Sequence, residues 1–328
     1  MQPRLTAMGL AIGLMLGAPA AQAFQPPANP APASPAAVAP AAATTTVEPL
    51  TVTAPKRQAA QLPSLVSRFV QQHGAPSRID QLSRWAVPLC PKTGGLTAPF
   101  NAFVSARVLQ VAKAVGLPAA RARNRDVACK TNLLIVFTTK PQTLLDNVRR
   151  DHPQMLGFHY AAQTRRLATF DQPIQSWYMT GTGGREGLPE PDTEFGRTPQ
   201  GTAGSRLSAG LTNQFMGVLV VIDSNQILGR QIGALADQIA MLSLARAAPI
   251  TGCSELPTIL DALNPDCKSA APPTEMTIYD VAYLKGLYSI DPEEFLAAQR
   301  SEIGSRMMRD LTAPPPASPS PQTASPKP

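Results

Sequence analysis

The stretch that decides the fold is Met216–Asp223, which reads Met-Gly-Val-Leu-Val-Val-Ile-Asp. Its continuous aliphatic run has strand length and predicts a strand buried on both faces of a sheet. Leu133–Phe137 has the same character, and Leu82–Leu89 is also strand-like. Apolar residues recur at helical spacing in segments 62–70, 100–115, 144–150, 230–247, 258–263, 277–288 and 292–311. This order predicts the α/β (α+β) class, as a three-layer domain with one mixed sheet.

The N-terminus has the features of a secretory signal peptide. Arg4 supplies the positive charge, Leu5–Leu16 is apolar, and Ala23 ends a small-x-small cleavage site. An uncleaved membrane anchor is the alternative, but the apolar stretch is shorter than the roughly 20 residues that span a bilayer. We expect residues 1–23 to be the signal peptide, and no transmembrane segment after its cleavage.

The composition shifts twice more along the chain. We expect a disordered Ala/Pro-rich linker at 24–60, a globular domain at 61–311 with a long loop at 181–211, and a disordered Pro/Ser-rich tail at 312–328. Segments of Ala, Pro, Thr and Ser bury too little apolar surface to offset the entropy lost on ordering.

The four cysteines are an even number in a chain that we expect to be exported. This favours disulfide bonds, which persist in oxidising compartments. Of the three possible pairings we favour Cys90–Cys129 and Cys253–Cys267, because each closes a loop within one half of the domain. A zinc site at Cys253 and Cys267 is the rival interpretation, but neither has a second ligand two to four residues away. We expect a periplasmic or secreted protein.

The net charge of +7 is concentrated between residues 107 and 166. The basic residues there are Arg107, Lys113, Arg121, Arg123, Arg125, Lys130, Lys140, Arg149, Arg150, Arg165 and Arg166. A basic face is typical of nucleic-acid binding, but export excludes that partner, and the stretch has no aromatic stacking platform. Two interpretations remain: a positive face exposed to solvent, or a surface that binds an anionic partner such as lipid head groups.

The segment Met276–Tyr288 carries a resemblance to a known class of enzyme. It resembles the closing helix of zinc peptidases of the matrix-metalloprotease and serralysin type, in which a Met turn precedes a pattern of Asp, hydrophobic residues and a final Leu-Tyr. The matching residues are Asp280, Val281, Leu284, Leu287 and Tyr288. The resemblance covers about 75 residues and implies a zincin-like C-terminal half, with Val218–Val221 as the edge strand and the helix from Arg230 as the zinc-binding helix. The whole chain also resembles exported proteins of alphaproteobacteria.

The chain departs from the zincin pattern at the metal site. Zincins hold zinc with two histidines at i and i+4 on one helix, beside a glutamate that acts as general base. The best overlay places Ala236 and Ala240 at the histidine positions and Asp237 at the glutamate position. Alanine has no lone pair for a cation, so we expect no metal and no cofactor. Asp237 is then a buried polar residue satisfied by hydrogen bonds.

The function predicted from these residues is non-catalytic binding or scaffolding in the cell envelope, on a zincin-like fold without its metal site. An envelope protein or peptide is the expected partner. The alternative is a hydrolase with a carboxylate-based site, formed by Asp237 with Glu255 or Asp261.

Four weaker signals remain. Glu48 to Ala54 resembles the TonB box of outer-membrane transporters, which would make TonB a partner by strand addition. Gly181-x-Gly183-Gly184 has no helix after it and does not indicate a nucleotide site. Trp177 and Tyr178 either line a cleft or lie in the core. The histidines, His73, His152 and His159, all precede the zincin-like motif, so we expect no metal at them.

Overall fold

The computed structural model describes residues 56–117, 129–157, 160–184, 189–193, 204–206, 208–248, 252–264, 267 and 272–313, with side chains from Ala60 onward. All of them belong to one unit, Thr53–Pro328. Several predicted features lie outside the described residues: the signal peptide, most of the linker, the TonB-box-like segment, nearly all of the tail, His159, and the arginines at 121, 123 and 125.

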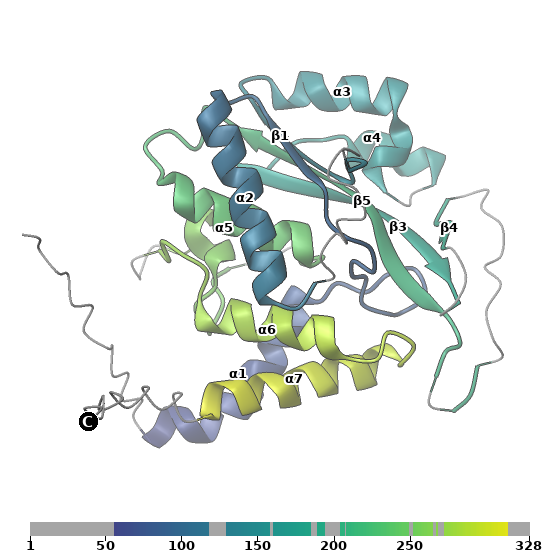
Figure 1. Ribbon diagram of the computed structural model, residues 1–328, viewed down its shortest axis with the longest axis vertical. Coiled ribbons are helices and arrows are strands. Elements are labelled where there is room, and N and C mark those ends of the chain that lie inside the picture. Colours follow the sequence, from purple (N-terminus) through teal and green to yellow (C-terminus); the bar gives the residue numbers. More distant parts are fainter. Residues whose placement is uncertain are drawn as a thin grey trace, which may run out of the picture. The chain divides into compact units, whose positions relative to one another are not determined.

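The core of the fold is a mixed five-stranded sheet, as the sequence predicts (Figure 1). Its order is β1-β2-β5-β3-β4, with bounds Pro91–Gly94, Leu133–Thr138, Thr212–Asp223, Ile174–Gly183 and Glu190–Pro191. β1, β2 and β5 are parallel to one another, while β3 runs antiparallel to β5 and to β4. The stretch quoted first therefore lies in the central strand. The expectation that Val218–Val221 forms an edge strand is wrong, because β2 and β3 flank it.

Helices cover both faces of the sheet, which gives the predicted three layers (Figure 1). On one face α3, Pro141–Asp151, and α4, Thr164–Leu167, pack over Trp177, Leu219 and Val221. On the other face α2, Ala98–Ala114, and α5, Ile232–Leu244, pack over Ile135, Val220 and Ile222. The second face continues into three more helices, which are α1, Lys56–His73, α6, Ile278–Ser289, and α7, Leu296–Thr312. Along β2 and β5, neighbouring side chains point to opposite faces of the sheet, so they pack into two separate hydrophobic cores.

Helix α5 is buried on almost every side, so the carbonyl groups at its C-terminal end cannot be satisfied by bulk water. Side chains from three other segments donate to them. Tyr178 hydroxyl lies 2.8 Å from Leu242 O, Trp85 Nε1 2.8 Å from Ser243 O, and Tyr288 hydroxyl 2.7 Å from Leu244 O. These bonds fix α5 relative to β3 and α6.

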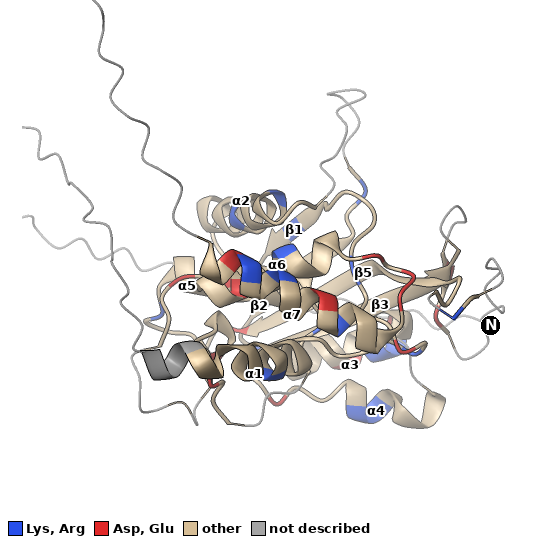
Figure 2. Cartoon of the chain, turned by 90° about the horizontal axis from the view of Figure 1, so that it is seen from below, with Lys and Arg blue, Asp and Glu red and all other residues tan. Residues whose placement is uncertain are grey.

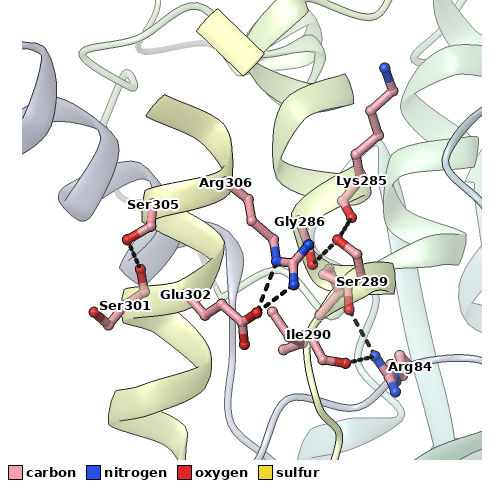
Figure 3. A network of polar contacts seen from close by, with 10 residues as sticks. Arg84, Lys285, Gly286, Ser289, Ile290, Ser301, Glu302, Ser305 and Arg306 are labelled. Atoms are coloured by element: carbon pink, nitrogen blue, oxygen red, sulfur yellow. Dashed lines mark hydrogen bonds and ion pairs between the residues drawn. The ribbon is translucent and has the colours of Figure 1, made fainter. Parts of the chain in front are cut away.

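Helix α6 is capped at both ends. Thr277 and Asp280 form a capping box at its N-terminus. At its C-terminus the guanidinium of Arg84 donates to Leu287 O and Ile290 O, at 3.2 and 2.8 Å (Figure 3). Burial lowers the pKa of Arg84. Beside it on α7, Arg306 pairs with Glu302 at 2.5 Å (Figure 3). Arg84 thus ties the segment before β1 to the C-terminal end of α6.

Three predicted boundaries differ from the structure. α1 begins at Lys56, inside the expected 24–60 linker. Segment 181–211 is not entirely loop, because Gly181–Gly183 completes β3 by pairing with residues 212–214, and residues 190–191 form β4. Leu82–Leu89 forms only isolated bridges, at Leu82 and Arg84, in place of a full strand. Strand pairing uses the backbone, so glycines without a strand-like side-chain pattern take part in it.

Both expected disulfides are present, Cys90–Cys129 and Cys253–Cys267. Such bonds are typical of a protein that functions outside the cytoplasm. Within the described part of the chain, no helix has the length and hydrophobicity needed to cross a membrane.

The described residues of the basic stretch do not form one continuous face. Arg107 and Lys113 lie on α2, whereas Arg165 and Arg166 lie on α4, across the sheet (Figure 2). Several of its arginines already have partners: Arg107 pairs with Asp237, Arg149 with Asp146, and Arg150 with Asp151. The described basic residues of the stretch therefore lie on both sides of the sheet.

Candidate functional site

A cavity of about 950 Å³ runs along the outer edge of β3. Consecutive residues of that strand, from Ile174 to Tyr178, line it. Neighbouring residues of a strand point to opposite faces of a sheet, so a cavity that touches all of them follows the edge of the strand. We call this cavity the β3 groove.

The strand edge in the groove is open. From Ile174 to Met179, β3 pairs only with β5 among the described residues, since β4 joins it at Gly181 and Thr182. Asp223 N donates to Pro173 O, so odd-numbered residues of this part of β3 face β5. The backbone N–H and C=O groups of Ile174 and Ser176 therefore point into the groove.

The open stretch is short because Gly157 closes one end. This glycine has a φ of 81°, and its backbone lies directly against Tyr178 O. A side chain there would overlap that carbonyl, so only glycine permits this approach.

Two walls enclose the edge. The first contains Ser77 and Arg78, which follow α1, together with Gln238, Leu242 and Arg246 from α5 and the turn after it. The second contains Leu156, Arg166 and Leu167 from the α3–α4 side. Side chains of a strand added at β3 would alternate between these walls.

Two buried polar side chains on the first wall each have one atom that finds no hydrogen-bond partner among the described residues. Ser77 and Gln238 are each 6% exposed, and Ser77 Oγ and Gln238 Oε1 are the unpartnered atoms. A buried polar atom without a partner costs about 1–3 kcal/mol. Both residues line the groove, so a ligand in it is positioned to supply the missing bonds.

Ala236 and Ala240, the positions expected to be degenerate zinc ligands, are fully buried in the main hydrophobic core. They do not line the groove; Gln238 and Leu242 of the same helix do. The two residues of α5, spaced i and i+4, that face the open strand edge are therefore Gln238 and Leu242. They lie two residues after Ala236 and Ala240, the pair chosen from the sequence.

Asp237 is part of an ion pair inside the fold. Its side chain is 2% exposed and accepts from Arg107 Nε at 2.5 Å and from Arg107 Nη2 at 3.0 Å. It also accepts from Met276 N at 2.8 Å. This carboxylate joins α2, α5 and the segment before α6, as expected for a buried, hydrogen-bonded aspartate, and its hydrogen bond raises the pKa of Arg107.

The two carboxylates proposed to act with Asp237 have other partners. Glu255 pairs with Arg68 at 2.6 Å on the surface. Asp261 accepts from Ser254 N at 3.3 Å, and burial raises the pKa of its carboxyl to about 6. No contact among these described residues joins the three carboxylates into one site.

The two described histidines, His73 and His152, do not line the groove. His73 is fully buried, stacks on Phe69 with ring centroids 3.8 Å apart, and donates from Nδ1 to Phe69 O. His152 is exposed at the end of α3. No group of three or more His, Cys, Asp or Glu side chains in the described ranges is placed to hold a metal ion.

Trp177 and Tyr178 combine both expected roles. Trp177 is buried and donates to Leu167 O at 2.8 Å, while Tyr178 caps α5, and both line the groove. Burial raises the pKa of Tyr178 to about 12, so its hydroxyl remains a donor at neutral pH.

Sequence reasoning missed the residues that form the groove: Ser77, Ile174, Ser176 and Gln238. The one available signal was Gln238 itself, a polar residue on a helix that is otherwise apolar nearly all round. Comparison with protein-family models, with curated protein sequences and with solved structures finds no match to this chain.

Proposed function

We propose that this chain is a non-catalytic binding or scaffolding protein of the cell envelope, periplasmic or secreted, and that it holds an extended peptide segment in the β3 groove. The support for a zincin-like scaffold is the resemblance of Met276–Tyr288 to the zincin closing helix, and alanines at 236 and 240 leave such a scaffold without its metal ligands. The observation that carries the proposal is the open edge of β3, where Ile174 and Ser176 direct backbone donors and acceptors into a cavity.

Strand addition is the mode of binding that matches this edge. An extended peptide gains affinity from main-chain hydrogen bonds to an exposed strand and specificity from pockets for alternate side chains. Ile174 and Ser176 each offer one N–H and one C=O. The groove volume of about 950 Å³ lies at the upper end of the range for small-molecule pockets, about 300–1,000 Å³, which suits several residues of an extended chain.

A carboxylate-based hydrolase has less support. Asp237 accepts hydrogen bonds from Arg107 and Met276 N. Glu255 is paired with Arg68, and Asp261 accepts from Ser254 N. A general base has to reach the proton of an attacking water, and a carboxylate held in a two-pronged ion pair is not placed to do so.

The test begins with selection of peptides from a random display library by the immobilised mature chain. Binding of the selected peptides is then measured on two variants, Ser176→Pro and Ser176→Ala. Proline removes the N–H that faces the groove, and edge strands tolerate proline at such positions. Alanine removes only the hydroxyl, which donates to Tyr178 Oη at 2.7 Å.

Loss of one backbone hydrogen bond is expected to weaken binding about threefold to tenfold in Ser176→Pro, and Ser176→Ala is expected to bind like the wild type. A peptide methylated on alternate backbone nitrogens gives the same comparison without altering the protein. Failure to select any peptide, or equal affinity for both variants and for methylated and unmethylated peptides, would contradict the proposal.

A further inference from the structure

The charged residues that line the β3 groove are mostly cationic. They are Arg78, Arg166, Arg246 and Asp171, three arginines against one aspartate in the described part of the chain. They occupy both walls, with Arg246 after α5 on the first wall and Arg166 on α4 on the second. In Figure 2 the α4 ribbon is coloured blue where its basic residues lie.

Arg246 is placed to bind a ligand. It is partly buried, and its guanidinium makes one hydrogen bond within the described residues, from Nη1 to Pro76 O at 3.3 Å. A guanidinium has five N–H donors, so most of its capacity remains for an acceptor in the groove. Partial burial strengthens a charge-assisted bond because less water screens it.

Gln238 adds a neutral recognition group beside Arg246. Both lie on the first wall, and Gln238 Oε1 is buried with no hydrogen-bond partner in the described part of the chain. An amide oxygen in this position accepts a hydrogen bond from a peptide N–H or a side-chain donor. Ser77 Oγ, also unpartnered on this wall, accepts or donates.

We propose that the occupant of the β3 groove is an acidic extended peptide, whose carboxylate side chains alternate between Arg246 on one wall and Arg166 on the other, while Gln238 and Ser77 bond to its polar groups. This inference rests on the proposed function, since the alternation requires a strand added at β3. Carboxylates accept from arginine in a two-pronged geometry that neutral side chains do not reproduce.

The probe is a selected peptide with blocked ends, made in three forms that carry Glu, Gln or Lys at the positions whose side chains alternate. Affinities are measured by fluorescence polarisation at low and high salt. The Glu form is expected to bind about tenfold tighter than the Gln form, with the difference shrinking at high salt, and the Lys form is expected to bind weakest.

Four substitutions on the protein, one of them a control, assign the contacts. Arg246→Gln and Arg166→Gln are each expected to weaken the Glu form about fivefold and to leave the Gln form unchanged. Arg149→Gln, on α3 and paired with Asp146 outside the groove, is the matched control and is expected to change neither. Gln238→Leu removes an acceptor that has no partner among the described residues, so it is expected to weaken binding without lowering the melting temperature.

The outcomes separate the two proposals. If the Glu and Gln forms bind equally to the wild type, the acidic occupant is overturned while peptide binding stands. If the Arg246, Arg166 and Arg149 variants lose affinity alike, the charge effect is general and the placement of carboxylates on the two walls is overturned. If no form binds at all, the proposed function fails, and this inference with it.

Discussion

Replacing Arg107 by methionine should destabilise the fold far more than a surface substitution of the same kind. The change removes the guanidinium that pairs with Asp237 but keeps a stem of similar length. Asp237, at 2% exposure, then keeps a buried negative charge with only Met276 N as donor. Breaking a buried ion pair costs about 3–5 kcal/mol. The Arg107 side chain is 30% exposed, so we expect the lower part of that range, about 3 kcal/mol.

For a domain of this size, about 3 kcal/mol lowers the melting temperature by about 6–12 °C. Urea unfolding of Arg107→Met, with the disulfides intact, measures the loss directly as a lower midpoint at unchanged slope. Arg149→Met is the control, because its pair with Asp146 is 38% and 47% exposed and should be worth at most about 1 kcal/mol. The double variant Arg107→Met/Asp237→Leu should recover part of the stability, because no unpaired charge is left in the core.

A loss below about 1 kcal/mol in Arg107→Met, equal to that of Arg149→Met, would refute this reasoning. Asp237 would then not depend on Arg107, and its assignment as a structural carboxylate would need another basis.

Three further predictions concern the disulfides, the buried histidine and the metal. Removing Cys90–Cys129, which spans 39 residues, should lower the free energy of unfolding by about 3.9 kcal/mol. Removing Cys253–Cys267, which spans 14 residues, should lower it by about 3.0 kcal/mol. Equal or reversed losses in the two double Cys→Ser variants would contradict this order. Burial lowers the pKa of His73, so protonation favours the unfolded chain, and stability should fall as pH drops below about 6.5. His73→Gln should reduce that dependence and the exposed His152→Gln should not. Purified protein should contain no stoichiometric zinc by elemental analysis and cleave no peptide bond; one equivalent of zinc, lost with peptidase activity on adding a chelator, would contradict that prediction.

Elements with strong local signals could be predicted from the sequence. The aliphatic run of β5 and the apolar periodicity of α5 and α6 form the expected strand and helices. β3 was missed, because its residues 174–183 have no continuous apolar run and end in Gly-Thr-Gly. Its pairing with β5 is a long-range contact that no local pattern encodes.

The site itself could not be predicted, because the direction in which a helix faces depends on its neighbours. The overlay on α5 chose Ala236 and Ala240, whereas Gln238 and Leu242 face the groove. Two residues correspond to a rotation of about 200° around a helix, nearly the opposite side. An apolar helix that is buried on most sides gives no polar stripe by which to fix that rotation. The open strand edge was equally hidden, since it depends on how far β4 pairs along β3.

Amide hydrogen exchange at single-residue resolution, with and without a saturating selected peptide, tests strand addition at β3 most directly. The N–H groups of Ile174 and Ser176 face the groove, so the peptide should slow their exchange. Those of Gln175 and Trp177 already face β5 and should change little. Slowing at Ile174 and Ser176 with little change at Gln175 and Trp177 is the predicted result. Unchanged exchange along residues 174–178 in the presence of bound peptide would contradict the account.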